Sequence, residues 1–250
     1  PQGVRRWVEI TPRTEGGVRA HVGSPNGAVV ASGHLGSWEL LLGFPSVFAD
    51  VTHVAFVAQA IMHPAVDRFL ATVRGSGGGS TVLSHGGARA LDRHVKGGGT
   101  AALLVDRNVR PGRGGIWVPF LGLEACTSPL PAWLARRNDV PLRMVFCLPG
   151  RGGRYALTLG EELALGVRSE DAEADILEIT RRINETLERV IRRHPEAWNW
   201  TLKRFKNRPA RDLAAYPAYS LWEPPPSRLR RRATPPRRAA GGASPGSVTS

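Results

Sequence analysis

Apolar runs and polar breaks alternate along the chain in a pattern that predicts an α/β fold. Short runs rich in valine, alanine and leucine predict strands, and most of them are followed by a segment with apolar residues at helical spacing. The predicted strands cover residues 27–32, 54–58, 81–83, 100–105, 141–148 and 155–159, and the predicted helices cover 38–48, 64–73, 87–96, 129–137 and 171–193. This alternation predicts an α/β fold with a mostly parallel central sheet sandwiched by helices.

Polar residues follow two of these predicted strands directly. His34 comes after the run that ends at residue 32, and Asp106 comes after the run that ends at residue 105. In open parallel sheets, ligands bind outside the carboxyl ends of the strands. We therefore expect both side chains at that edge of the sheet, where they can serve a function.

His34 and Glu39 are five positions apart, and on a single helix they would point about 140° away from each other. They can meet only if His34 stays in the turn and Glu39 lies in the first turn of the helix. A carboxylate is favoured there by the helix dipole, and it can bind one imidazole nitrogen while the other acts as a base. Such a pair without a protein nucleophile suits acyl transfer from a thioester to a substrate hydroxyl. The spacing alone is equally typical of a capping histidine and an ordinary first-turn acid.

The net charge of +13 is unevenly distributed. Residues 223–250 contain six arginines and one acid among Pro, Ala, Gly and Ser, a composition that predicts a disordered tail. The remainder, residues 1–222, is predicted to form a single domain. Its remaining positive charge suggests phosphate-bearing partners, such as anionic lipid, nucleic acid or an acidic carrier protein. A compositional bias towards arginine is the plainer alternative.

Several classes of site are not indicated by the sequence. Cys126 and Cys147 lack metal-ligand spacing and are expected to be buried, reduced thiols. The histidines show no paired metal-ligand spacing, so no metal is predicted. No run reaches the roughly 18 apolar residues of a membrane span. The first residues are strand-like, and the start at Pro1 leaves open an upstream segment that could carry an anchor.

Four blocks of the chain, in order, resemble the bacterial lipid A late acyltransferases, the lauroyl and myristoyl transferases of the H-x4-D/E glycerolipid acyltransferase superfamily. HLGSWEL resembles their HFGNWE-like block, and ALDRHVKGGGTAALLVDRN resembles their block of helix, glycine, apolar strand and Asp-Gln. IWVPFLGLEA resembles their PFFG block, and HPEAWNWTLKRFKNRP resembles their carboxy-terminal Trp-x-Trp block. The resemblance implies a glycerol-3-phosphate-acyltransferase-like fold.

The resemblance assigns roles to individual residues. His34 would be the general base and Glu39 its charge-relay partner, while Asp106 matches the acid of the Asp-Gln pair. The chain departs from the family at Arg107, where Gln is usual, and at Gly33, where Asn is common. An Asp-Arg pair also occurs in the related mycobacterial phosphatidylinositol-mannoside acyltransferases, but the Trp-x-Trp block favours the lipid A branch.

Basic residues are the candidates for binding the substrate and the membrane. Arg74 matches a family arginine suited to the phosphate or sugar of the acceptor, because a guanidinium offers a planar fork to phosphate oxygens. The basic residues just beyond Trp198 and Trp200 could meet anionic headgroups, although solvated charge and core packing are the plainer explanations. The substrate-binding residues predicted in this way are Arg74, Asp106, Arg107, Lys203 and Arg204.

The resemblance implies an O-acyltransferase that moves a fatty acyl chain from acyl carrier protein or acyl-coenzyme A to a hydroxyl of a phosphorylated glycolipid, above all a lipid A precursor. It implies no cofactor, and a peripheral position on the cytoplasmic face of the bacterial inner membrane. Acylation of a phosphatidylinositol mannoside or another glycolipid is the alternative among enzymes. The sequence pI of about 11.2 also suits a basic nucleic-acid-binding protein, and a silent relative that only binds lipid is a third possibility. The motifs do not specify acyl chain length, donor, acceptor or oligomeric state.

Overall fold

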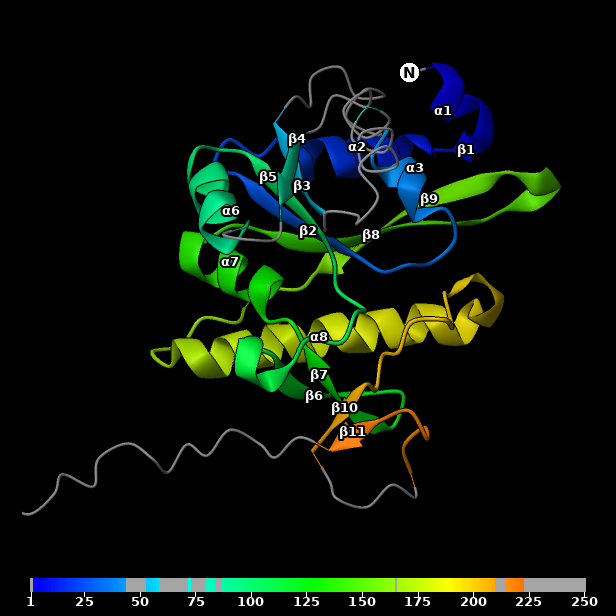
Figure 1. Cartoon of the computed structure of the whole chain (residues 1–250). Helices are drawn as coiled ribbons and strands as arrows, with labels where there is room; N and C mark the ends of the chain where they lie inside the picture. Colours follow the sequence, from blue (N-terminus) through cyan, green and yellow to red (C-terminus); the bar gives the residue numbers. More distant parts are fainter. Residues whose placement is uncertain are drawn as a thin grey trace, which may run out of the picture.

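The computed structural model describes residues 2–43, 53–58, 72, 80–83, 87–164, 166–209 and 215–222. Within these residues, seven strands form one sheet in the order β1-β9-β8-β2-β5-β3-β4 (Figure 1). All neighbouring strands are parallel except β8 and β9, which are antiparallel. The predicted, mostly parallel sheet is confirmed. The strands are β1 Val8–Glu9, β2 Ala28–Ser32, β3 Val54–Ala58, β4 Ser80–Leu83, β5 Thr100–Leu104, β8 Leu142–Pro149 and β9 Tyr155–Glu162.

Helices cover both faces of the sheet, as predicted (Figure 1). On one face lie α1 (Gln2–Trp7), α2 (Pro12–Val22) and α3 (Trp38–Leu41), over an apolar cluster that includes Val18. On the other face lie α6 (Gly87–Lys96), α7 (Leu130–Asn138) and α8 (Ala172–Arg193), over the larger apolar cluster. The sheet is therefore the middle layer of three.

The long helix α8 shows how the sequence pattern produces the fold. Asp171 caps it, because its side chain accepts hydrogen bonds from the backbone N–H groups of Glu173 and Ala174. The apolar stripe that predicted the helix packs into the core: Ile179, Ile183, Leu187 and Ile191 are all almost fully buried. The predicted range 171–193 is thus confirmed to within its capping residue.

Two regions differ from the expectation. The strand-like start is wrong for most of the first residues, because α1 and α2 flank the two-residue strand β1. Thr11 caps α2 and Pro12 stands at its first position, a helix start signal that outweighs the local strand propensity. A hairpin of β6 (Ile116–Phe120) and β7 (Leu123–Thr127) was not predicted either. The remaining elements are short: η1 Pro111–Arg113, η2 Arg151–Gly153, η3 Pro195–Ala197, β10 Asn207–Arg208 and β11 Leu221–Trp222.

Some predicted features lie outside the described residues. These are residues 44–48 of the predicted helix 38–48, residues 64–71 and 73 of the predicted helix 64–73, Arg74, and the tail 223–250. Within the described residues, the helix predicted over 38–48 ends earlier, at Leu41. The extent of a single domain over 1–222 stays a prediction. Cys126 and Cys147 are buried free thiols, as expected, and burial raises the pKa of Cys147 to about 12.

Candidate active site

The register of two neighbouring strands brings His34 and Asp106 together. In the parallel pair of β2 and β5, Ser32 lies opposite Leu104, and the backbone N–H of Val105 donates to the carbonyl of Ser32 across 2.9 Å. His34 and Asp106 each come two residues after these paired positions. They therefore meet at the carboxyl edge of the sheet, where the sequence predicted both of them.

The Asp106 carboxylate holds His34 by two hydrogen bonds. Its Oδ1 is 2.7 Å from Nδ1 of the imidazole, and its Oδ2 accepts the backbone N–H of His34, also at 2.7 Å. Oδ2 accepts a third bond, 3.0 Å long, from the indole N–H of Trp198. Because an ionised carboxylate can only accept, Nδ1 must carry the proton, and Nε2 is left with its lone pair. This is the arrangement of a base and the acid that orients it.

Asp106 is completely buried, yet its environment favours the charged form. Burial by itself raises the pKa of this carboxyl, but the hydrogen bonds from His34 and Trp198 outweigh the burial and lower the pKa below its usual value. The side chain of His34 is 16% exposed. A charged acceptor thus lies behind the imidazole, and the ring itself reaches the surface.

Glu39 has the expected local structure but not the expected contact. It lies in the first turn of the four-residue helix α3, and it is exposed. Within the described residues, the acid at Nδ1 of His34 is Asp106, so the expected orienting bond from Glu39 is corrected to Asp106. The physical reason is the pairing of β2 with β5, which brings the carboxyl end of β5 beside the turn. From α3 it is Trp38 that packs against the imidazole, with 5.1 Å between the ring centres. A catalytic role for Glu39 stays a prediction.

Two residues predicted to bind substrate are buried. Asp106 accepts hydrogen bonds from His34 and Trp198, so it supports the imidazole, and its predicted contact with substrate stays a prediction. Arg204 is also completely buried: its guanidinium donates to the carbonyl of Cys126 and to the Thr127 hydroxyl, and it lies 5.0 Å from the centre of the Phe120 ring. Burial lowers the pKa of Arg204 to about 10, against the attraction of Asp106. Arg204 is thus held in the core, and its predicted contact with substrate stays a prediction.

The substrate-binding roles of Arg107, Lys203 and Arg74 stay predictions. Arg107 and Lys203 are exposed, and the ammonium of Lys203 lies 5.9 Å from the centre of the Tyr219 ring. Arg74 lies outside the described residues. The two tryptophans of the predicted aromatic and basic cluster differ in burial, because Trp198 is only 5% exposed whereas Trp200 is 60% exposed.

Two glycines allow the turn between β2 and α3 to pack closely. A Cβ atom on Gly33 would lie 3.2 Å from Oδ2 of Asp106 and within 3 Å of a methyl carbon of Leu187. Gly36 has φ +55°, and a Cβ atom there would collide with the backbone of Cys147 and Leu148. Close packing behind His34 therefore leaves little room for a side chain at position 33.

The carboxy-terminal segment is hydrogen-bonded to the turn that carries His34. The sequence did not predict this contact. The backbone N–H of Asn199 donates to the carbonyl of His34 over 3.0 Å, and the N–H of Gly36 donates to the carbonyl of Ala197 over 2.8 Å. Leu35 and Trp198 form an antiparallel bridge between the two segments. The Trp-x-Trp pattern was the available signal, but it does not say which of the two indoles faces the core.

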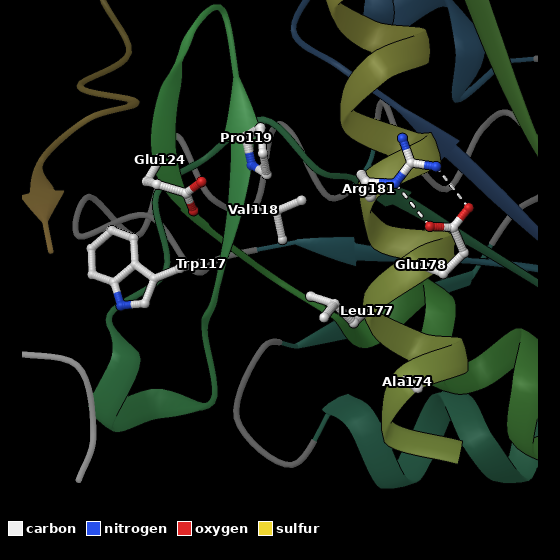
Figure 2. A pocket seen from close by; sticks show the side chains of 8 residues that line it. All are labelled: Trp117, Val118, Pro119, Glu124, Ala174, Leu177, Glu178 and Arg181. Carbon is white, nitrogen blue, oxygen red and sulfur yellow. Dashed lines mark hydrogen bonds and ion pairs between the residues drawn. The ribbon is translucent and has the colours of Figure 1, made fainter. Parts of the chain in front are cut away.

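A groove elsewhere on the molecule does not contain the site. It lies between the β6–β7 hairpin and the first half of α8, with Trp117 and Glu124 on the hairpin side and the ion pair of Arg181 with Glu178 on the helix (Figure 2). None of the predicted site residues lines it. Over the described ranges, no group of three potential ligands could hold a metal ion, and no helix combines the length and apolarity of a bilayer span.

The comparisons with known proteins agree with the geometry. Residues 4–207 match the sequence model of the family described as bacterial lipid A biosynthesis acyltransferase. The match contains both strands that carry the His34–Asp106 pair and the segment with Trp198. Among curated proteins, none matches the chain.

Proposed function

Because the chain belongs to the bacterial lipid A biosynthesis acyltransferase family, we propose that it transfers a fatty acyl chain from a thioester to a hydroxyl of a phosphorylated glycolipid. The donor is acyl carrier protein or acyl-coenzyme A, and the acceptor we favour is a lipid A precursor. The observation that carries this proposal is the 2.7 Å contact between Nδ1 of His34 and Oδ1 of Asp106. It supplies an oriented base, and no serine or cysteine among the described residues is hydrogen-bonded to that imidazole.

The reaction follows from the protonation state of His34. Nε2 takes the proton of the acceptor hydroxyl as the hydroxyl oxygen attacks the thioester carbonyl. The new C–O bond forms, the C–S bond breaks, and the imidazolium returns its proton to the leaving thiolate. The charge of Asp106 stabilises the imidazolium between these steps, as the buried acid does in a serine triad. The chain itself forms no covalent intermediate.

An assay with defined donors and acceptors tests this function. The purified protein is incubated with acyl carrier protein or coenzyme A thioesters and with a lipid A precursor, and the lipids are weighed by mass spectrometry. A mannosylated phosphatidylinositol and an ornithine lipid serve as alternative acceptors. We expect a product one acyl group heavier, and we expect His34→Ala to lower its rate about 10²- to 10⁴-fold. Equal product from the wild type and from His34→Ala would contradict the mechanism.

Glu39 is tested in the same assay. If it takes part near Nε2 or the acceptor, Glu39→Gln lowers the rate while the folded structure persists. If Asp106 alone serves His34, Glu39→Gln keeps the wild-type rate and Asp106→Asn loses it. The two amide variants therefore show which of the two acids the reaction needs.

We also propose that the protein acts at the cytoplasmic face of the bacterial inner membrane. Several exposed side chains around β10 and β11 support contact with anionic lipid: aromatic and apolar groups suit the interface, and lysines suit the headgroups. Lys203 lies against Tyr219, and the carbonyl of Lys206 accepts the N–H of Leu221. We call this the β10–β11 surface, and its members are Lys203, Lys206, Tyr219, Leu221 and Trp222.

A further inference from the structure

Trp198 makes contacts that its position in the sequence does not suggest. Its indole N–H donates to Oδ2 of Asp106, the same atom that accepts the backbone N–H of His34. Its ring packs edge-on against Phe120, with 5.8 Å between the ring centres. The side chain therefore fixes the carboxylate on the side away from the imidazole.

The backbone on both sides of Trp198 is bound to the turn that carries His34. The carbonyl of Ala197 and the N–H of Asn199 pair with this turn, at Gly36 and His34 respectively. Trp198 thus contributes its side chain to Asp106 while its neighbours hold the backbone of the base. No other described side chain besides His34 and Trp198 donates a recorded hydrogen bond to Asp106.

Further along, the same segment is anchored in the core. The side-chain amide of Asn108 donates to Asn207 over 2.6 Å, and the backbone N–H of Asn207 donates back to Asn108. Arg204 is held by Cys126 and Thr127. These contacts keep residues 197–207 in one position against the carboxyl ends of β2 and β5.

From these contacts we infer that Trp198 is a positioning residue for the reaction. Its indole N–H holds Oδ2 of Asp106 by a hydrogen bond. Oδ1 therefore stays aligned with Nδ1 of His34, and Nε2 keeps its orientation towards the substrate. This inference rests on the proposed function, because it concerns the base that the function requires. Trp198 acts through Asp106, because the described contacts include no hydrogen bond between its side chain and Nε2 of His34.

Trp200 provides a matched control. It is two residues away and also donates its indole N–H, but to the carbonyl of Pro195 over 2.7 Å. The Trp200 ring also packs edge-on against Trp198, with 4.6 Å between the ring centres, and phenylalanine keeps an aromatic ring in that place. Trp198→Phe and Trp200→Phe therefore each remove one indole donor from the same segment, and only the first removes it from Asp106. Both variants are compared with the wild type for kcat and KM of the thioester, for thermal unfolding, and for the downfield NMR signal of the Nδ1 proton of His34.

We expect Trp198→Phe to lower kcat about 10- to 100-fold with little change in KM, since a hydrogen bond to a charged group is lost. We expect the Nδ1 proton signal to shift in this variant and to stay in place in Trp200→Phe. Equal kcat values and equal proton shifts for the two variants would overturn the inference.

A second variant keeps the test decisive if Trp198→Phe does not fold. Replacing Trp198 with benzothienylalanine keeps the shape of the ring and removes only the N–H. A reduced kcat in this variant supports the inference even if Trp198→Phe unfolds, and a wild-type kcat overturns it. The NMR signal is independent of turnover. A wild type that transfers no acyl group therefore refutes the proposed function, while the signal still tests the link from Trp198 to His34.

Discussion

Asp106 lies 72 positions beyond His34 in the sequence, yet its carboxylate binds both the side chain and the backbone of that histidine. One oxygen accepts from the ring and the other from the main chain. The imidazole is therefore fixed in angle as well as in tautomer.

Asp106→Asn should lower kcat about 10²- to 10⁴-fold, because an amide is uncharged and stabilises the imidazolium poorly. The KM of the thioester should change little. Asp139→Asn is the matched control: Asp139 is exposed, pairs only with surface Arg168 among the described contacts, and has a positive φ that asparagine also tolerates. A wild-type rate for Asp106→Asn would rule out its orienting role.

Gly36→Ala should destabilise the fold and lower activity. The new methyl group would need a φ of +55° and would press on the backbone of Cys147 and Leu148, which cannot move aside as a side chain can. Gly122→Ala separates the two effects, since Gly122 has φ +83° but open space around it. We expect a loss of about 1 kcal/mol at Gly122 from the backbone conformation alone. Urea unfolding should show a clearly larger loss at Gly36.

Arg204 and Lys203 are neighbours with opposite surroundings, so the same substitution should have different effects. Arg204→Met leaves the carbonyl of Cys126 and the hydroxyl of Thr127 without this donor, and it should cost about 1–3 kcal/mol in the free energy of unfolding. Lys203→Met should leave that free energy nearly unchanged. If both variants unfold at the wild-type urea concentration, the guanidinium does not stabilise the core.

The β10–β11 surface should bind anionic vesicles in a salt-dependent manner. Replacing Lys203 and Lys206 together with glutamine should weaken binding to phosphatidylglycerol-containing vesicles, at about 1 kcal/mol per lysine. Vesicles of phosphatidylcholine alone should show no such difference. The matched control is Arg89→Gln with Arg93→Gln on α6, which removes the same charge from another exposed face. Equal weakening by both pairs would assign binding to net charge.

Stability at low pH should depend on Asp175. Its pKa is lowered to about 2 by the backbone N–H of Ser169 and by the Arg136 guanidinium, against a usual value of about 4. A lowered pKa stabilises the fold above the unfolded-state value, and this contribution is lost as the pH falls from about 4 to about 2. Asp175→Asn should therefore show a shallower loss of stability over this window in urea titrations. Parallel curves for both proteins would contradict the assignment.

The sequence predicted the edge at which the site lies but not the acid that serves His34. Runs 27–32 and 100–105 each end just before a polar residue, and this was enough to place His34 and Asp106 at one edge. The choice of Glu39 relied on spacing within a single segment and on the resemblance of that segment to the HFGNWE-like block. Which strands are neighbours depends on tertiary packing, and only the pairing of β2 with β5 brings Asp106 to the imidazole.

The carboxy-terminal block shows the same limit. The pattern of aromatic and basic residues from Trp198 onwards marked a functional region, but local composition does not distinguish a buried side chain from an exposed one. Arg204 is a basic residue of the kind that binds anionic ligands, but its side chain is buried in the core. The burial of Arg204 depends on its contacts with Phe120, Cys126 and Thr127. These three residues come from the β6–β7 hairpin, which the sequence did not predict.

The pairing of residues 197–199 with the turn at His34 also bears on the order of synthesis. A ribosome completes His34 and Asp106 long before Trp198, so an emerging chain holds the base and its acid without the segment that secures them. A chain interrupted before residue 197 would carry a loosely held histidine. Competence would then arise only after residue 199 has been added and the segment has paired with this turn.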